Sequence, residues 1–206
     1  HTTHLISNDE LIELRASMTP ALFACNYELK IIADENALFT NAQFTKEEPT
    51  DGICHIDAGY GGADASAFTV IADKGGYFVI YGRKYQKHID DCLDDILALK
   101  AKYLGGTTYT EKNADKGYLA KELKSRGDVA NTYHEKMNKH IKISTYLKEN
   151  WGRVYFTEDT DPEYIAEVLD YNEHAPHDDC PDSLASAIRQ MSKKPMTLNK
   201  GVHKGI

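Results

Sequence analysis

The chain has 206 residues, of which 41% are hydrophobic, enough for one domain of ordinary size with a packed core. Its formal net charge is −8, whereas dedicated nucleic-acid-binding proteins are usually basic. The charge therefore disfavours that class, but it leaves room for an enzyme that touches DNA through a local basic face. No apolar run approaches the ~20 residues of a membrane span, so we expect a soluble, intracellular protein with no membrane partner.

Residues 1–50 are expected to form an N-terminal arm that leads into the domain. Ser7-Asn8-Asp9 is typical of a helix start, and apolar residues at helical spacing follow until Pro20. A polar stretch that contains proline, residues 44–51, reads as a connector. The alternative, in which this arm is an integral layer of the fold, also remains open.

From Ile53 onward the pattern becomes that of a sheet. Short apolar runs predict strands over residues 53–57, 68–72 and 77–81, and the last two are joined by the turn Asp73-Lys74-Gly75-Gly76. An apolar stripe at helical spacing predicts a helix over residues 88–103.

The rest of the chain alternates strands and helices. We expect strands at 107–110, 129–134 and 154–156, and helices from Asp115 to about 125, over 139–150, from Asp161-Pro162, and from Pro181. This order predicts an α/β fold with a mixed sheet, in which three antiparallel strands precede helix-connected ones. Such an order resembles the ribonuclease H-like sheet. The domain is placed at 51–192, followed by a flexible tail over 193–206.

Acidic residues stand at three points of this pattern. Asp57 ends the first strand of the sheet, and Glu111 ends the strand that follows the first crossover helix. Adjacent parallel strands would bring these two residues to the same edge of the sheet, where open α/β sheets bind ligands. The last helix begins in the run Asp178-Asp179-Cys180-Pro181-Asp182, where residues three or four apart share a face. Which of the three aspartates faces the site is left open by this spacing.

Carboxylates that converge without paired bases repel one another unless cations lie among them. A set made only of carboxylates suits Mg²⁺ or Mn²⁺. Two such ions about 3.5–4 Å apart can activate a water and stabilise the leaving oxygen of a phosphodiester. We therefore expect two divalent cations, with Asp57 as the bridging ligand.

Three motifs closely resemble those of a known family. They are HIDAGYGGADASAFTVI, YTEKNADKGYLAKEL and HDDCPDSLASAIRQM. Together they are similar to the acidic motifs of the nuclease domain of tailed-bacteriophage terminase large subunits, over about residues 52–191. That domain is a ribonuclease H-like, metal-dependent endonuclease that cuts concatemeric double-stranded DNA during viral packaging.

The resemblance implies roles for particular residues. Asp57, Glu111 and Asp179 would be metal ligands, with Asp178 and Asp182 as rivals or helpers. Asp64 would be a supporting acid, and His177 a ligand or proton-transfer group, although a loop histidine without a role is an equal alternative. The implied partners are double-stranded DNA, the terminase small subunit and the portal, in the host cell cytoplasm. No P-loop is found, so the ATPase domain that the family carries is absent from these residues.

One segment is locally basic. Residues 112–148 hold nine lysines and arginines against four acids, an excess of five positive charges. A groove for duplex phosphates is one interpretation, and solvated helices are the other. The residues proposed for DNA binding are Lys112, Lys116, Lys136, Lys139 and Lys142.

Three other classes of protein compete with this hypothesis. A junction resolvase of the same superfamily would be expected to carry a stronger basic surface. A non-catalytic DNA-docking module would not need all three acidic motifs. Actin-like kinases share the turn after Asp57, but they need a second phosphate loop and an adenosine motif, for which 206 residues leave no room.

Overall fold

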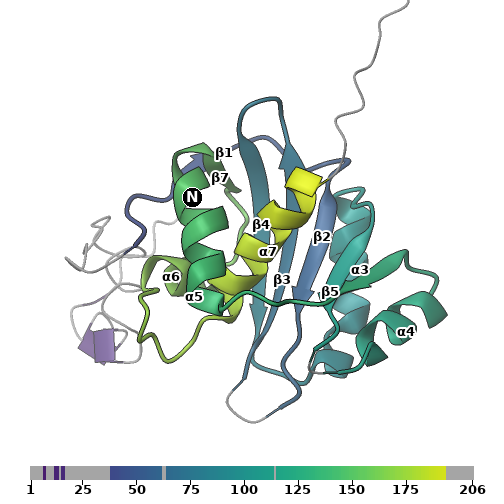
Figure 1. Cartoon of the computed structure of the whole chain (residues 1–206). Coiled ribbons are helices and arrows are strands. Elements are labelled where there is room, and N and C mark those ends of the chain that lie inside the picture. Colours follow the sequence, from purple (N-terminus) through teal and green to yellow (C-terminus); the bar gives the residue numbers. More distant parts are fainter. Residues whose placement is uncertain are drawn as a thin grey trace, which may run out of the picture.

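The computed structural model describes residues 38–193 except 62, 63 and 114, together with the single positions 7, 12, 13, 15 and 16. Its centre is a seven-stranded mixed sheet with the strand order β1-β7-β4-β3-β2-β5-β6 (Figure 1). The strands are β1 (Gln43–Thr45), β2 (Ile53–Asp57), β3 (Ser66–Asp73), β4 (Phe78–Tyr85), β5 (Thr108–Glu111), β6 (Ala130–Tyr133) and β7 (Val154–Thr157).

Helices connect and cover these strands. They are the 3₁₀ turn η2 (Ile89–Asp91), α3 (Leu93–Lys102), α4 (Tyr118–Ser125), α5 (Lys139–Lys142), the π-helical turn η3 (Ile143–Leu147), the 3₁₀ turn η4 (Lys148–Arg153), α6 (Pro162–Leu169) and α7 (Asp179–Lys193).

The pairing of the strands is that of the expected fold. β2, β3 and β4 form an antiparallel meander, and β5 and β6 extend the sheet in parallel beyond β2. β7 pairs in parallel with β4 at the other side. The meander followed by helix-connected parallel strands confirms the predicted α/β fold with a ribonuclease H-like mixed sheet.

Helices cover both faces of the sheet. On one face α7 lies across β2 and β3, with η3 and α6 beside it, and this layer packs on Ile53, Ile71 and Phe156 (Figure 1). On the other face α3 and α4 pack on Ile56 and Val70. Because side chains alternate along a strand, β2 contributes to both cores.

Several boundaries differ from the predictions. β4 runs on to Tyr85, and α7 begins at Asp179 instead of Pro181, because proline is accepted in the first turn of a helix. The helix predicted over 139–150 is not continuous: α5 passes through a π-helical turn into a 3₁₀ segment. The helix predicted over 88–103 is likewise divided, at Cys92.

Part of the expected arm belongs to the sheet. β1 pairs in parallel with β7, and Phe39 is buried against Trp151 and Tyr171. The sheet therefore begins before the boundary predicted at residue 51, as in the alternative in which the arm is a layer of the fold. The helix predicted before Pro20 lies outside the described residues except for isolated positions, as does the tail after Lys193.

The described cysteines, Cys54, Cys92 and Cys180, are free and buried. Among the described residues, no helix has the length and apolar character needed to cross a membrane.

Candidate active site

Two neighbouring strands place Asp57 and Glu111 next to each other. β2 and β5 are parallel, and the pair Ile56–Thr110 is in register, so the next residue on each strand is one of the two acids. Residues in register on adjacent strands have their side chains on the same face, about 5 Å apart. Both acids therefore lie at the carboxyl end of the sheet, as the sequence predicts for adjacent parallel strands.

The turn after Asp57 requires a glycine. A Cβ on Gly59 would lie 2.6 Å from the carbonyl oxygens of Asp64 and Ala65, closer than real Cβ atoms approach backbone. The amide of Gly59 also donates a hydrogen bond to the hydroxyl of Ser66, at 3.0 Å. This close packing of the two sides of the turn fixes where β2 ends, and with it the position of Asp57.

The start of α7 brings further acids to the same place. Asp182, with 2% of its surface exposed, lies in the first turn of α7, next to Ser183, whose hydroxyl is 3.0 Å from His55 on β2. Asp179 accepts a hydrogen bond from the amide of Ala65, at 3.2 Å. Asp178 lies just before the helix and is less buried. The sequence did not predict which aspartate would lie deepest, and in the structure it is Asp182.

The acids perturb one another. Burial, followed by the charge of Asp182, raises the pKa of Asp57 well above its ordinary value. Burial also raises the pKa of Glu111, and Asp182 again contributes. Burial raises the pKa of Asp179 to about 6. The charge of Asp182 therefore makes it harder for Asp57 to lose its proton.

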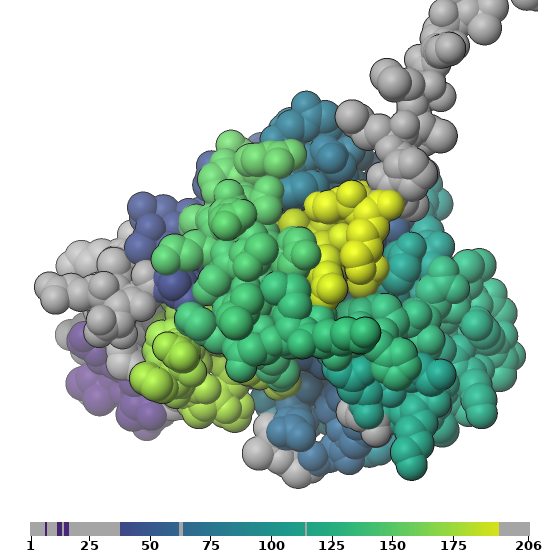
Figure 2. Space-filling model, in the orientation of Figure 1, coloured from purple at the N-terminus to yellow at the C-terminus, as the bar shows by residue number. Residues whose placement is uncertain are grey.

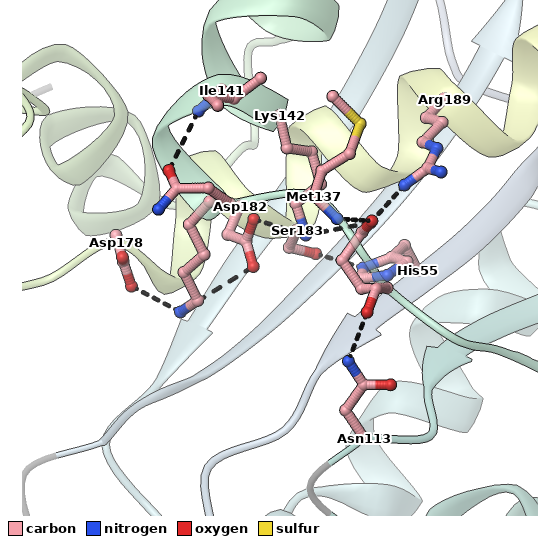
Figure 3. Close-up of polar contacts among 12 residues, drawn as sticks. His55, Asn113, Met137, Ile141, Lys142, Asp178, Asp182, Ser183 and Arg189 are labelled. Carbon is pink, nitrogen blue, oxygen red and sulfur yellow. Dashed lines mark hydrogen bonds and ion pairs between the residues drawn. The ribbon is translucent and has the colours of Figure 1, made fainter.

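Two lysines of α5 lie against these acids. The ammonium of Lys139 donates a hydrogen bond to Asp178 at 2.8 Å and is 3.9 Å from Asp182. The ammonium of Lys142 is 2.7 Å from Asp182 and 3.7 Å from Glu135 (Figure 3). Lys142 has no exposed surface, so its prediction as a DNA contact is wrong: a buried ammonium cannot reach a phosphate of the duplex.

A histidine that was not among the predicted site residues lies beneath the acids. His55 is buried, with its ring nitrogens 3.0 Å from the hydroxyl of Ser183 and 2.8 Å from that of Tyr133. Ser183 in turn is 2.9 Å from Thr69 of β3. This network connects β6, β2, α7 and β3. The only signal in the sequence is the spacing of His55 and Asp57, which puts both on one face of β2.

The remaining predicted residues are distributed around the edge. Asp64 is exposed in the turn after β2, where it forms an isolated bridge with Gly61, and His177 is exposed in the loop before α7. Lys112 directly follows Glu111, and Lys112, Lys116 and Lys136 are all exposed. The supporting role of Asp64 and the ligand role of His177 stay predictions.

The donor set fits a divalent cation in its chemistry. Oδ2 of Asp57 is buried and has no hydrogen-bond partner, a costly arrangement that a bound cation would relieve. Carboxylate oxygens are the ligands of Mg²⁺ and Mn²⁺. Among the described residues, however, no three His, Cys, Asp or Glu side chains are already arranged to hold a metal ion. Asp178 and Asp182 are instead engaged by lysines, so the α7 acids would have to turn toward Asp57.

Comparison with solved structures shows the same fold in viral nucleases. The chain is similar to the large terminase nuclease from thermophilic phage G20c with bound magnesium, with TM-score 0.56 and 19% identity over 76% of this chain and 98% of that one. For the same nuclease with bound zinc the values are 0.54 and 21%, over 74% and 94%. The large terminase from a second thermophilic bacteriophage gives 0.57 and 12%, covering 90% of this chain and 52% of that chain.

These likenesses establish the fold. The chain spans nearly the whole G20c nuclease but about half of the second phage's large terminase. No protein-family model matches the sequence. No curated protein matches it either. The structural resemblance predicted from the three acidic motifs is therefore confirmed, at the level of the fold.

Proposed function

We propose that this chain is the nuclease domain of a phage terminase large subunit and hydrolyses phosphodiester bonds of double-stranded DNA with Mg²⁺ or Mn²⁺. The observation that carries the proposal is the meeting of Asp57 and Glu111, in register on β2 and β5, with Asp182 of α7 close enough to perturb Asp57. The fold shared with terminase nucleases, whose structures hold magnesium and zinc, supports it.

In this proposal Asp57, Glu111 and an acid at the start of α7 would hold two divalent cations, which would supply an activated water and charge stabilisation for the leaving oxygen. The chain itself contributes the placement of the acids. Asp57 and Glu111 are fixed by their strands, whereas Asp182 is held by Lys142 in the metal-free protein and would turn toward Asp57 when a cation binds. Asp179 is the other candidate ligand on α7, with Asp178 and His177 further out. Concatemeric viral DNA as substrate, the terminase small subunit and the portal as partners, and the host cytoplasm as location belong to the same proposal.

DNA would approach along the exposed lysines that flank the acids. Lys112 follows Glu111 at the end of β5, and Lys136 and Lys139 lie on the segment that leads from β6 into α5. Positive side chains on both sides of the carboxylates would hold the two phosphate backbones while the acids remain between them.

Supercoiled plasmid tests this function. We expect the purified chain to nick and then linearise the plasmid with Mn²⁺ or Mg²⁺ and to leave it intact with a chelator. Asp57→Asn should reduce cleavage by at least about a hundredfold, because it removes a carboxylate charge from the metal site. Glu158→Gln, which changes an exposed acid after β7, is the matched control and should cut like the parent.

Equal cleavage by Asp57→Asn and the parent would contradict the proposal. A four-way junction offered beside linear duplex separates the resolvase alternative, which predicts strong preference for the junction.

A further inference from the structure

Lys142 is an unusual residue for the position it occupies. It ends α5, a helix of one turn whose start is capped by Asn138, which accepts a hydrogen bond from the amide of Ile141 (Figure 3). Its side chain has no exposed surface. Lysine is almost never fully buried unless it is paired, because removing an ammonium from water costs several kcal/mol. The acids around Lys142 must therefore supply its compensation.

These acids form a buried chain of alternating charges. Lys142 lies between Asp182, at 2.7 Å, and Glu135, at 3.7 Å, and Glu135 also pairs closely with Arg189. Asp182 and Arg189 both lie on α7, about two turns apart, so this series of charged side chains begins and ends on the same helix. The charges of the two acids and the two bases cancel. The series of ion pairs joins α7 to α5 and to the segment before α5.

Lys142 differs from its neighbour Lys139. The Lys139 side chain is 48% exposed and can leave Asp178 for solvent or for a phosphate. Lys142 has no such freedom, since the chain around α5 (green) lies over part of α7, whose later turns emerge in yellow (Figure 2). The Lys142 side chain is consequently held in place beside Asp182.

An ammonium held at this position affects any ion at the site. Lys142 is the charge that most strongly opposes the raised pKa of Glu111, and it lowers the pKa of Asp57 as well, after Lys139. A divalent cation that shares Asp182 would lie within a few ångströms of the ammonium, where like charges repel strongly. In the metal-free protein, the same ammonium reduces the repulsion between Asp57, Glu111 and Asp182.

We propose that Lys142 is a fixed internal cation of this site. It is a positioning residue that keeps the carboxylates assembled before any metal binds and weakens the binding of whichever divalent ion shares Asp182. The proposal rests on the metal-dependent function proposed above and assigns to this lysine the control of metal affinity.

Mn²⁺ binding, followed by electron paramagnetic resonance of the free ion, tests this role without any substrate. Lys142→Met, which removes the charge and keeps a similar length, should raise the Mn²⁺ affinity roughly tenfold. Its melting temperature should fall without metal and rise more than the parent's when Mg²⁺ is added. Lys142→Arg keeps the charge and should bind Mn²⁺ like the parent. Lys121→Met, which changes an exposed lysine of α4, should do the same.

A second variant keeps the proposal testable if Lys142→Met does not fold. Glu135→Gln removes an acid next to the ammonium and should lower the Mn²⁺ affinity, opposite to the change in Lys142→Met. Parent-like Mn²⁺ affinity in both variants, or a change in the same direction, would overturn the role of Lys142. If the parent cuts plasmid while both variants bind Mn²⁺ as it does, only this inference fails. If the parent neither binds Mn²⁺ nor cuts, the proposed function fails and the inference with it.

Discussion

His55 shows how a single residue connects the scaffold to the site. Its two ring nitrogens contact Ser183 of α7 and Tyr133 of β6, and it lies two residues before Asp57 on the same strand. Burial, with the nearby charge of Lys142, lowers the pKa of His55 to about 3. The imidazole is thus neutral near pH 7, as a buried hydrogen-bonded ring should be.

This histidine makes folding stability depend on pH. Its pKa is lower in the folded than in the unfolded chain, so the unfolded chain takes up a proton below about pH 6.5 and the folded one does not. Stability is therefore lost as pH falls, by up to about 1.4 kcal/mol per pH unit from this residue. The difference in unfolding free energy between the parent and His55→Asn, from urea titrations at pH 7.5 and pH 5, should shrink at the lower pH.

The exposed Asn131 supplies the control. Asn131→Ser changes no ionisable group, so its difference from the parent should be the same at both pH values. A pH-independent difference for His55→Asn would mean that His55 takes up a proton as readily in the folded chain as in the unfolded chain.

Asp179 gives a second dependence on pH, of the opposite sign. Its pKa of about 6 exceeds the ordinary 3.8, so the folded chain holds the extra proton between these values. Its contribution to the metal-free protein is full below the ordinary pKa and is lost as pH rises through 6.

A metal must displace that proton, and the pKa values of Asp57 and Asp182 are raised as well. We expect the Mn²⁺ affinity to fall steeply as pH is lowered from 7 to 5, measured by calorimetry. Equal affinity at pH 7 and pH 5 would show that these carboxyl groups do not bind the ion.

At the level of residues, the sequence predicted the positions of side chains that stand at the end of a strand. Asp57 and Glu111 end strands, so their meeting follows from the parallel pairing alone. His55, Lys142 and Glu135 were missed as parts of the site, because their partners are defined only by how α7 and α5 pack on the sheet. No local pattern marks a lysine that will be buried.

Among the elements, the turn between β2 and β3 has a strict packing requirement at Gly59. Gly59→Ala would push a methyl group against two backbone carbonyls, which cannot move without shifting the turn. We expect it to lower the unfolding free energy by about 1–3 kcal/mol and to reduce plasmid cleavage, because Asp57 moves with the turn.

Gly152, in η4, is the matched control. A Cβ on it would meet no atom within 4 Å, so Gly152→Ala should change stability by less than about 0.5 kcal/mol in the same thermal or urea unfolding experiments. Equal effects of the two substitutions would contradict the packing described for the turn.

Most helices and strands could be predicted from local sequence signals, whereas the boundaries of the others depend on tertiary contacts. The apolar run of β2 and the Asp161 cap of α6 are encoded locally, and both elements begin where predicted. The extension of β4 to Tyr85 depends on the pairing of its last residues with β3, which no local pattern reveals. The break from α5 into η3 and η4 depends on the packing of Ile143 and Leu147 under α7.

At the scale of the whole molecule, an acidic chain carries its basic residues where the proposed function needs them. Although the net charge is −8, exposed lysines lie near the end of β5 and before α5. β1 and β7 widen the sheet on the side away from β5 and β6, so β2 and β5 lie fifth and sixth in the order of seven strands. The sequence predicted the central order of this sheet and left open whether the arm, which contributes β1, belongs to the fold.

The central claim is that acids from distant parts of the chain gather around divalent ions. A crystal of the protein soaked in Mn²⁺ tests it most directly, through the anomalous signal of the metal. We predict a peak at coordination distance from both Asp57 and Glu111, with Asp182 or Asp179 turned toward it. A well-ordered crystal in which Mn²⁺ binds elsewhere, or not at all, would contradict the account.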